Sequence, residues 1–127
     1  MDQSRRPYFG RGLRELRESF VRRLSSGGED MPYVRATVSA SALIDCMKKE
    51  QGFSISSAAY NEIENGLNVP RDATSFLDAV ATCLRLTEDQ KRDLSKRLAY
   101  DLVWARLGDD RTDEIIPPSP HWRRPTP

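Results

Sequence analysis

The chain has 127 residues, of which 38% are hydrophobic and 31% are charged, and its formal net charge is +1. This length suits one domain with a modest core, and a near-neutral charge neither requires nor excludes a polyanionic partner. No apolar run approaches the ~18 residues of a membrane span, and no secretory pattern begins the chain, so we expect a cytoplasmic protein without a membrane segment.

The first expected helix has an apolar side and a basic side. After a flexible stretch over residues 1–8, apolar side chains recur in steps of three and four from Phe9 to Leu24. Arginines fill the other side, and two interpretations stay open for the leading ones: contact with phosphates, or a solvated face with local glutamate pairs. The leading arginines are Arg5, Arg6 and Arg11. A loop over 25–32 and an extended segment over 33–38 follow.

Two short helices are expected in the middle of the chain. Serines that can cap a helix and glycines that can end one set their limits. The first runs from a cap at Ser39 or Ser41 to about Glu50, before Gly52, and the second runs over 57–65, between Ser56 and Gly66. Apolar residues fall on one face of each: Leu43, Ile44, Cys46 and Met47 in the first, and Ala59, Tyr60 and Ile63 in the second.

Two longer helices complete the expected domain. Asp72 begins one that runs to about Leu84, and a capping box of Thr87 and Gln90 begins another that runs to about Leu107. The expected inward residues are Phe76, Leu77, Val80, Ala81 and Leu84, then Leu94, Leu98, Leu102 and Ala105. Two aromatic residues beside the last stripe either pack on their own domain or form a dimer seam: Tyr100 and Trp104.

The remaining residues, 108–127, are expected to be a disordered tail. They contain five prolines and many charged side chains, so they cannot bury enough apolar surface to fold alone. A short docking motif over 121–124 is the alternative interpretation of this segment.

The two cysteines, Cys46 and Cys83, both fall at apolar helical positions. Two thiols without a nearby histidine lack a set of metal ligands, and a reducing cytoplasm disfavours disulfides. We therefore expect two unlinked cysteines that pack in the core.

Three features resemble the DNA-binding domain of the phage repressor and Cro family, also called XRE-like, of the actinobacterial type. They are the run Leu13–Glu18, the turn Gly52–Ser56, and Ile63-Glu64-Asn65-Gly66 followed by Pro70 and by Phe76–Val80. The resemblance covers residues 9–86. It implies an all-α, five-helix, lambda repressor-like helix-turn-helix domain over 9–107, whose last helix, 87–107, is extended. It also implies an Arg17–Glu64 ion pair, which fixes helix register more than it adds stability.

The resemblance makes the helix over 56–65 the one that reads DNA bases. In helix-turn-helix proteins the second helix of the pair enters the major groove with its N-terminal residues leading. The leading side chains here can bond adenine, accept from cytosine or touch a thymine methyl, and they are Ser56, Ser57, Ala58, Asn61 and Glu62. Besides the N-terminal arginines, phosphate contacts are expected from Lys48, Lys49, Asn65, Asn68 and Arg71.

The sequence thus predicts a nucleoid-associated, repressor-like regulator that binds double-stranded DNA as a homodimer and needs no cofactor or metal. An enzyme is not expected, because the single histidine lies in the tail and no glycine-rich phosphate loop is present. A second hypothesis keeps the fold but gives it a protein partner, as an antitoxin or an adaptor to the transcription machinery. It draws on the absence of Lys and Arg from the helix over 56–65.

Overall fold

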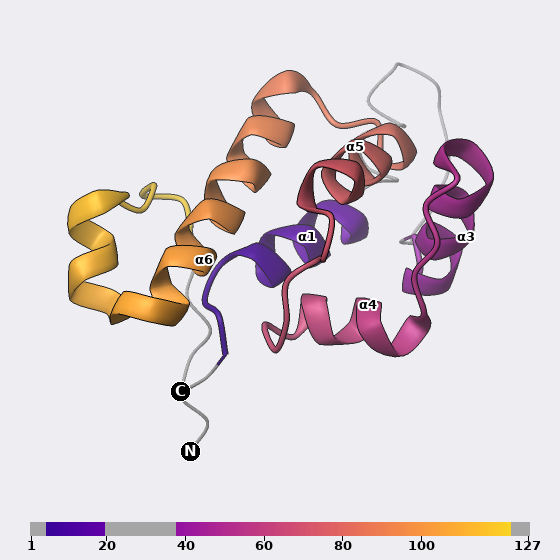
Figure 1. The fold of residues 1–127 in the computed structure, drawn as a ribbon. Helices are drawn as coiled ribbons and strands as arrows, with labels where there is room; N and C mark the ends of the chain where they lie inside the picture. Colours follow the sequence, from indigo (N-terminus) through magenta and orange to yellow (C-terminus); the bar gives the residue numbers. More distant parts are fainter. Residues whose placement is uncertain (1–4, 20–37, 123–127) are drawn as a thin grey trace.

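Helices make up all the regular structure in the part of the chain that the computed structural model describes, residues 5–19 and 38–122. They are α1 (Phe9–Glu18), α3 (Ala40–Gln51), α4 (Ser57–Glu64), α5 (Ala73–Cys83) and α6 (Glu88–Ile115) (Figure 1). The predicted all-α class is therefore confirmed for these residues. None of their helices is long and apolar enough to cross a membrane. The predicted end of the first helix at Leu24 and the loop over 25–32 lie outside the described residues.

Local capping signals begin the helices where the sequence indicates. The side-chain oxygens of Ser39, Ser56 and Asp72 each accept a hydrogen bond from the backbone N–H three residues later, at 3.0, 3.1 and 3.2 Å. Thr87 and Gln90 form the reciprocal capping box of α6. Each cap satisfies a backbone donor that has no partner inside the helix, so these starts depend only on nearby residues.

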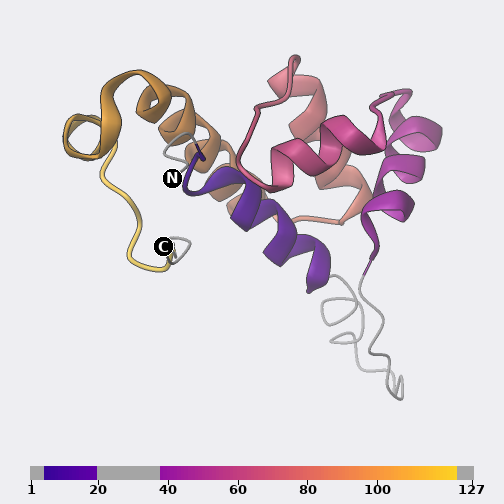
Figure 2. The same ribbon diagram turned by 90° about the horizontal axis from the view of Figure 1, so that it is seen from below.

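One core joins all the helices. α1 packs against α4 and α6, α3 packs against α4 and α5, and α5 packs against α6. The buried apolar side chains are Phe9, Leu13, Leu43, Met47, Tyr60, Ile63, Phe76, Leu77, Ala79, Val80, Leu84, Leu94 and Leu98. This packing leaves the outer side of α4 at the surface, as the view from below shows (Figure 2).

The inward side of α6 differs from the predicted stripe of leucines. Its first two leucines are buried, but Leu102 is 46% exposed and Ala105 is also exposed. Asp101 is buried instead, and its carboxylate accepts the backbone N–H groups of Tyr8 and Phe9 at 3.1 and 2.8 Å. α1 has no side-chain cap of its own, so a carboxylate from α6 satisfies its first donors. These two bonds hold Asp101 in the interior, whereas the spacing of the leucines predicted that Leu102 would point inward.

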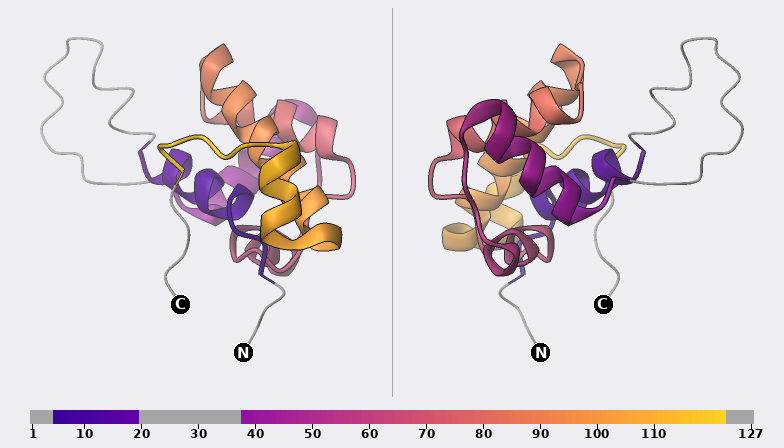
Figure 3. Two further views of the ribbon diagram at one scale, coloured as in Figure 1. Left: turned by 90° about the vertical axis from the view of Figure 1, so that its left-hand side faces the viewer. Right: turned by 90° about the vertical axis from the view of Figure 1, so that its right-hand side faces the viewer.

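The prediction of a disordered tail is wrong for residues 108–122. Gly108 interrupts α6, but the helix resumes, and the chain beyond it turns back toward α1 (Figure 3). Trp122 is only 7% exposed, because its ring lies 4.7 Å from that of Tyr8 and its indole N–H donates to Asp93 at 2.8 Å. Composition excludes a tail that folds alone, but it says nothing about an aromatic surface already in place for the tail to cover.

The tail completes a second, smaller aromatic cluster of Tyr8, Tyr100 and Trp122. Tyr100 is fully buried in it, so this residue is not available to a dimer seam, whereas Trp104 is partly exposed at its edge. His121 remains exposed at the surface, with its Nε2 3.2 Å from a carboxylate oxygen of Asp93. The described part of the proposed docking motif thus contacts its own chain, while Arg123 and Arg124 lie outside the described residues.

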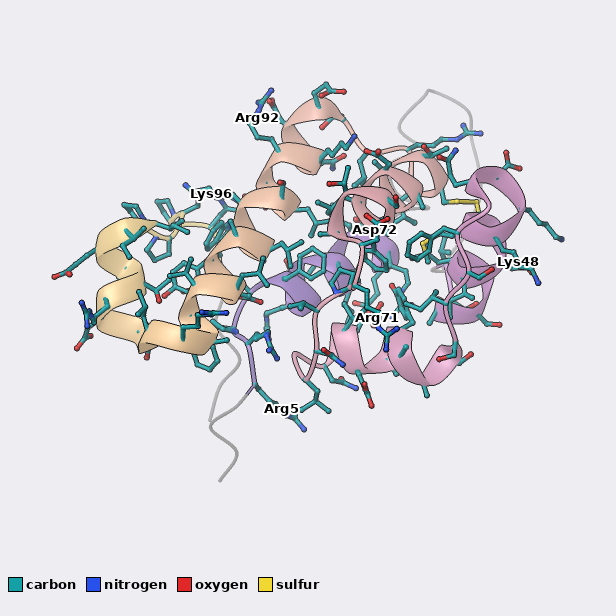
Figure 4. The ribbon with its side chains drawn as sticks, in the orientation of Figure 1. Arg5, Lys48, Arg71, Asp72, Arg92 and Lys96 are labelled. Atoms are coloured by element: carbon teal, nitrogen blue, oxygen red, sulfur yellow. A yellow bond between two sulfur atoms is a disulfide. The ribbon has the colours of Figure 1, made fainter. Side chains whose placement is uncertain are left out.

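The two cysteines are linked, contrary to the expectation of two unlinked residues. Cys46 of α3 and Cys83 of α5 form a disulfide, with their Cα atoms 6.1 Å apart (Figure 4). Their apolar helical positions place both where α3 packs against α5, so the pairing follows from that packing. Their separation of 37 residues hides it from any local pattern.

Candidate nucleic-acid interface

A buried ionic network holds the inner side of α4. Arg17 of α1 donates to both carboxylate oxygens of Glu64, at 2.7 and 2.9 Å, so the ion pair implied by the family resemblance is present. The Tyr60 hydroxyl donates to the same carboxylate at 2.6 Å. Arg17 also donates to the backbone carbonyl of Val38 at 2.8 Å. One guanidinium therefore joins α1, α4 and the segment that leads into α3.

Hydrogen bonding keeps this network in one protonation state. Burial and the bond to Glu64 raise the pKa of Tyr60, so its hydroxyl stays a donor. Burial would raise the pKa of Glu64, but the bonds from Arg17 and Tyr60 outweigh it and the pKa falls below its ordinary value of 4.5. The bond to Glu64 likewise raises the pKa of Arg17. A two-bond contact between planar charged groups fixes the rotation of α4 about its axis.

The outer side of α4 carries the residues predicted to read bases. Ser57, Ala58, Asn61 and Glu62 are all exposed. Glu62 accepts a long hydrogen bond of 3.4 Å from the Asn68 amide. These side chains are small or short, and they offer hydroxyl, amide, methyl and carboxylate groups to a surface that approaches α4.

Ser56 has a structural task that its predicted role did not include. Its hydroxyl oxygen accepts the backbone N–H of Ala59 at 3.1 Å, which caps α4. Ser56 is exposed, so its hydroxyl hydrogen can still be donated outward.

The cations predicted to meet phosphates fall into two groups, one at each end of α4. Lys48 and Lys49 are exposed in the last turn of α3, on the side where α4 begins. Arg5, Arg6 and Arg11 lie at the other end of α4, where residues 64–66 line the same cleft. Figure 4 shows Arg5 beyond one end of α4 and Lys48 beyond the other. The two groups are therefore separated along α4.

The other three predicted phosphate contacts surround the end of α4. Arg71 is exposed just before α5 and lies in front of α4 in Figure 4. The Asn65 amide oxygen accepts from Arg14 at 3.3 Å, and the Asn68 amide oxygen accepts the backbone N–H of Val69 at 3.0 Å. Both asparagines thus shape the turn after α4.

Sequence reasoning missed two side chains of this region, Arg14 and Tyr60. Arg14 donates to Glu64 at 3.4 Å as well as to Asn65. Helical spacing held the signal for both, since Arg14 precedes Arg17 by three residues and Tyr60 precedes Glu64 by four. Tyr60 was expected in the core only as an apolar residue.

A groove of about 520 Å³ lies beside α4. The turn after α3 and the segment before α5 form its other walls, with Phe53, Ile55 and Val69 as apolar lining and Arg71 and Asp72 among the polar lining. No group of three His, Cys, Asp or Glu side chains within the described residues is arranged to hold a metal ion.

Comparison with models of protein families, with curated proteins and with solved structures gives no match for this chain. What the chain binds must therefore be inferred from its own residues.

Proposed function

We propose that the chain is a sequence-specific transcription regulator that binds double-stranded DNA, with α3 and α4 as the helix-turn-helix pair of a lambda repressor-like domain. The observation that carries this proposal is the setting of α4. Its rotation is fixed by the buried carboxylate of Glu64, and Ser57, Asn61 and Glu62 remain exposed to solvent. A fixed helix with outward hydrogen-bonding side chains is what recognition in the major groove requires.

The dimensions of α4 support the same use. An α-helix with its side chains is ~10–12 Å across, and the major groove of B-form DNA is ~12 Å wide, so α4 fits into the groove. Cations stand at both ends of α4, where the two phosphate backbones flank the groove. These contacts supply affinity without reading sequence, while the outward side chains of α4 supply specificity. A homodimer would place two such helices ~34 Å apart, on half-sites separated by one helical turn.

The alternative function, a protein-interaction module such as an antitoxin or an adaptor, draws on the groove beside α4. Its apolar lining and the lack of Lys and Arg on α4 suit an apolar partner side chain. Salt separates the two functions, because phosphate contacts weaken steeply as salt rises and apolar contacts do not.

Selection of duplexes from a random pool by the purified protein, repeated at two salt concentrations, tests the proposal. We expect enrichment of a palindromic motif whose halves lie one helical turn apart. Retention without any motif, lost at modest salt, would show that the arginines only adhere to polyanions. Binding that salt does not weaken would favour the protein partner.

Two substitutions locate the contacts on the selected duplex. Asn61→Ala should cost about 1–3 kcal/mol and relax the preference at one base pair, because the amide can bond one adenine at two atoms. Arg71→Ala should weaken binding to all sequences equally and lower the slope of log affinity against log salt by about 0.9. An Asn61→Ala protein that keeps the full preference would show that α4 does not read bases through this residue.

A further inference from the structure

A cleft at the C-terminal end of α4 gathers four arginines. It measures about 360 Å³ and lies between α1, the segment that precedes it and residues 64–66. The arginines come from two elements and line one space: Arg5, Arg6, Arg11 and Arg14. By comparison, the groove beside α4 has one arginine, Arg71, in its wall.

The backbone fixes the position of the N-terminal arginines. The Arg6 N–H donates to the carbonyl of Gly66 at 2.8 Å, and Gly66 has a positive φ of 77°. A side chain at Gly66 would place its Cβ 2.7 Å from the Arg6 carbonyl oxygen, so only glycine permits this approach. Pro7 and Tyr8 are buried immediately afterwards. Arg6 therefore starts from a fixed point beside α4.

The carboxylates of the cleft do not balance its arginines. Glu64 already has short bonds from Arg17 and Tyr60, so the 3.4 Å contact from Arg14 adds little to it. The Arg14 side chain is 48% exposed and can turn away without leaving a buried charge unpaired. Arg11 and Glu15 are 3.6 Å apart at the surface, in a pair of a kind that contributes little. With Glu15 and Glu18, the described lining of the cleft has three carboxylates and four arginines.

One donor in the cleft wall also lacks a partner. Within the described residues, the Arg6 Nε–H is buried and donates to no hydrogen-bond acceptor, while the charge of Arg6 acts on buried Asp101. Arg6, Arg11 and Arg14 thus bring three arginine side chains to one cleft, of which Arg14 is loosely held and Arg11 weakly paired. One guanidinium group can bond two oxygens of a phosphate with parallel hydrogen bonds, so this cleft favours an anion over an apolar ligand.

We infer that this cleft binds a phosphate group and that Arg14 exchanges its contacts with Glu64 and Asn65 for phosphate oxygens on binding. Only the source of the phosphate rests on the proposed function: if the chain binds DNA, the phosphate belongs to the DNA backbone. Lys48 and Lys49 stand at the other end of α4, so the cleft holds the strand on the opposite side of the groove. Arg14, which the sequence did not single out, becomes a principal contact.

The test compares the double variant Arg11→Gln/Arg14→Gln with the double variant Arg92→Gln/Lys96→Gln, which removes the same charge. Arg92 and Lys96 lie on α6, away from α4 (Figure 4). The Arg17–Glu64 pair remains in both proteins, and unfolding curves check that both fold. We expect the first variant to lose about tenfold in DNA affinity at 0.1 M salt and to lower the salt slope by about 1–2, with unchanged base preference. The control should bind like the wild type.

A second arm follows the arginine side-chain signals by NMR during titration with inorganic phosphate. If all three proteins bind DNA with the same slope of log affinity against log salt, the cleft does not bind phosphate, but the proposed function stands. If no duplex binds and phosphate still shifts the Arg11 and Arg14 signals, the cleft stands as a site for free phosphate and the proposed function fails. If neither DNA nor phosphate affects these signals, both fail.

Discussion

At the residue scale, Glu64 does most to define the surface of α4. Its carboxylate is 4% exposed and receives Arg17 and Tyr60 together, and it is the point at which α1 contacts α4 through charge. Replacing a buried ion pair by apolar groups can be neutral, whereas removing one partner leaves a buried charge. The pair therefore specifies an orientation more than it adds net stability.

Glu64→Gln should lower the free energy of unfolding at pH 7 by about 3 kcal/mol, because Arg17 is left without a charged partner. The native pKa of Glu64 lies below its ordinary value of 4.5, so its contribution is complete above pH 4.5 and is lost as the pH falls through that lowered pKa. Urea unfolding between pH 7 and pH 3 should show this loss in the wild type and not in the variant.

Tyr60→Phe is the matched control for this prediction. It removes one hydrogen bond to Glu64 but leaves the ion pair, and it should cost about 1 kcal/mol. If the free energy of unfolding depends on pH in the same way in the wild type and in Glu64→Gln, the Glu64 carboxylate is not paired with Arg17 in solution.

At the element scale, two glycines with positive φ stand at the ends of α3 and α4. Gly52 ends α3 at φ 66°, and Gly66 follows α4 at φ 77°. They have different surroundings, because a Cβ at Gly52 would meet no atom within 4 Å, while one at Gly66 would approach the Arg6 backbone. The first sets the turn between the paired helices, and the second brings the N-terminal segment to α4.

Gly52→Ala should destabilise the protein by about 1 kcal/mol, the cost of a left-handed conformation for an alanine. Gly66→Ala should cost at least ~1 kcal/mol more, since the same strain is joined by a clash that displaces Arg6. Thermal or urea unfolding of the two variants measures the difference. Equal losses would show that the backbone contact between Arg6 and Gly66 does not form in solution.

At the scale of the whole molecule, two long-range links hold the chain together beyond its main core. The disulfide joins α3 to α5, and the tail residue Trp122 joins the end of the chain to Tyr8 and Asp93. Disulfides persist in oxidising surroundings and are rare in a reducing cytoplasm. If the protein is cytoplasmic, as the sequence predicts, we therefore expect the Cys46–Cys83 bond to be reduced there.

Reduction should lower the free energy of unfolding by up to about 4 kcal/mol, because the bond closes a loop between residues 37 positions apart. The double variant Cys46→Ser/Cys83→Ser, measured with and without reductant, is the control and should match the reduced wild type within about 1 kcal/mol. A wild-type stability that does not change with reductant would show that the two cysteines are not linked in solution.

Sequence patterns were enough to predict where α3, α4, α5 and α6 begin and which side of α4 is exposed. Serine, aspartate and threonine caps act on donors three residues away, and helical periodicity places Ala58 and Glu62 opposite Tyr60, so both are local properties. The features that depend on residues distant in the chain follow from tertiary packing. They are the Cys46–Cys83 bond, the buried positions of Asp101 and Trp122, and the cleft that both Arg6 and Arg14 line. Their partners meet only after the helices pack, and composition or spacing cannot report a contact that packing creates.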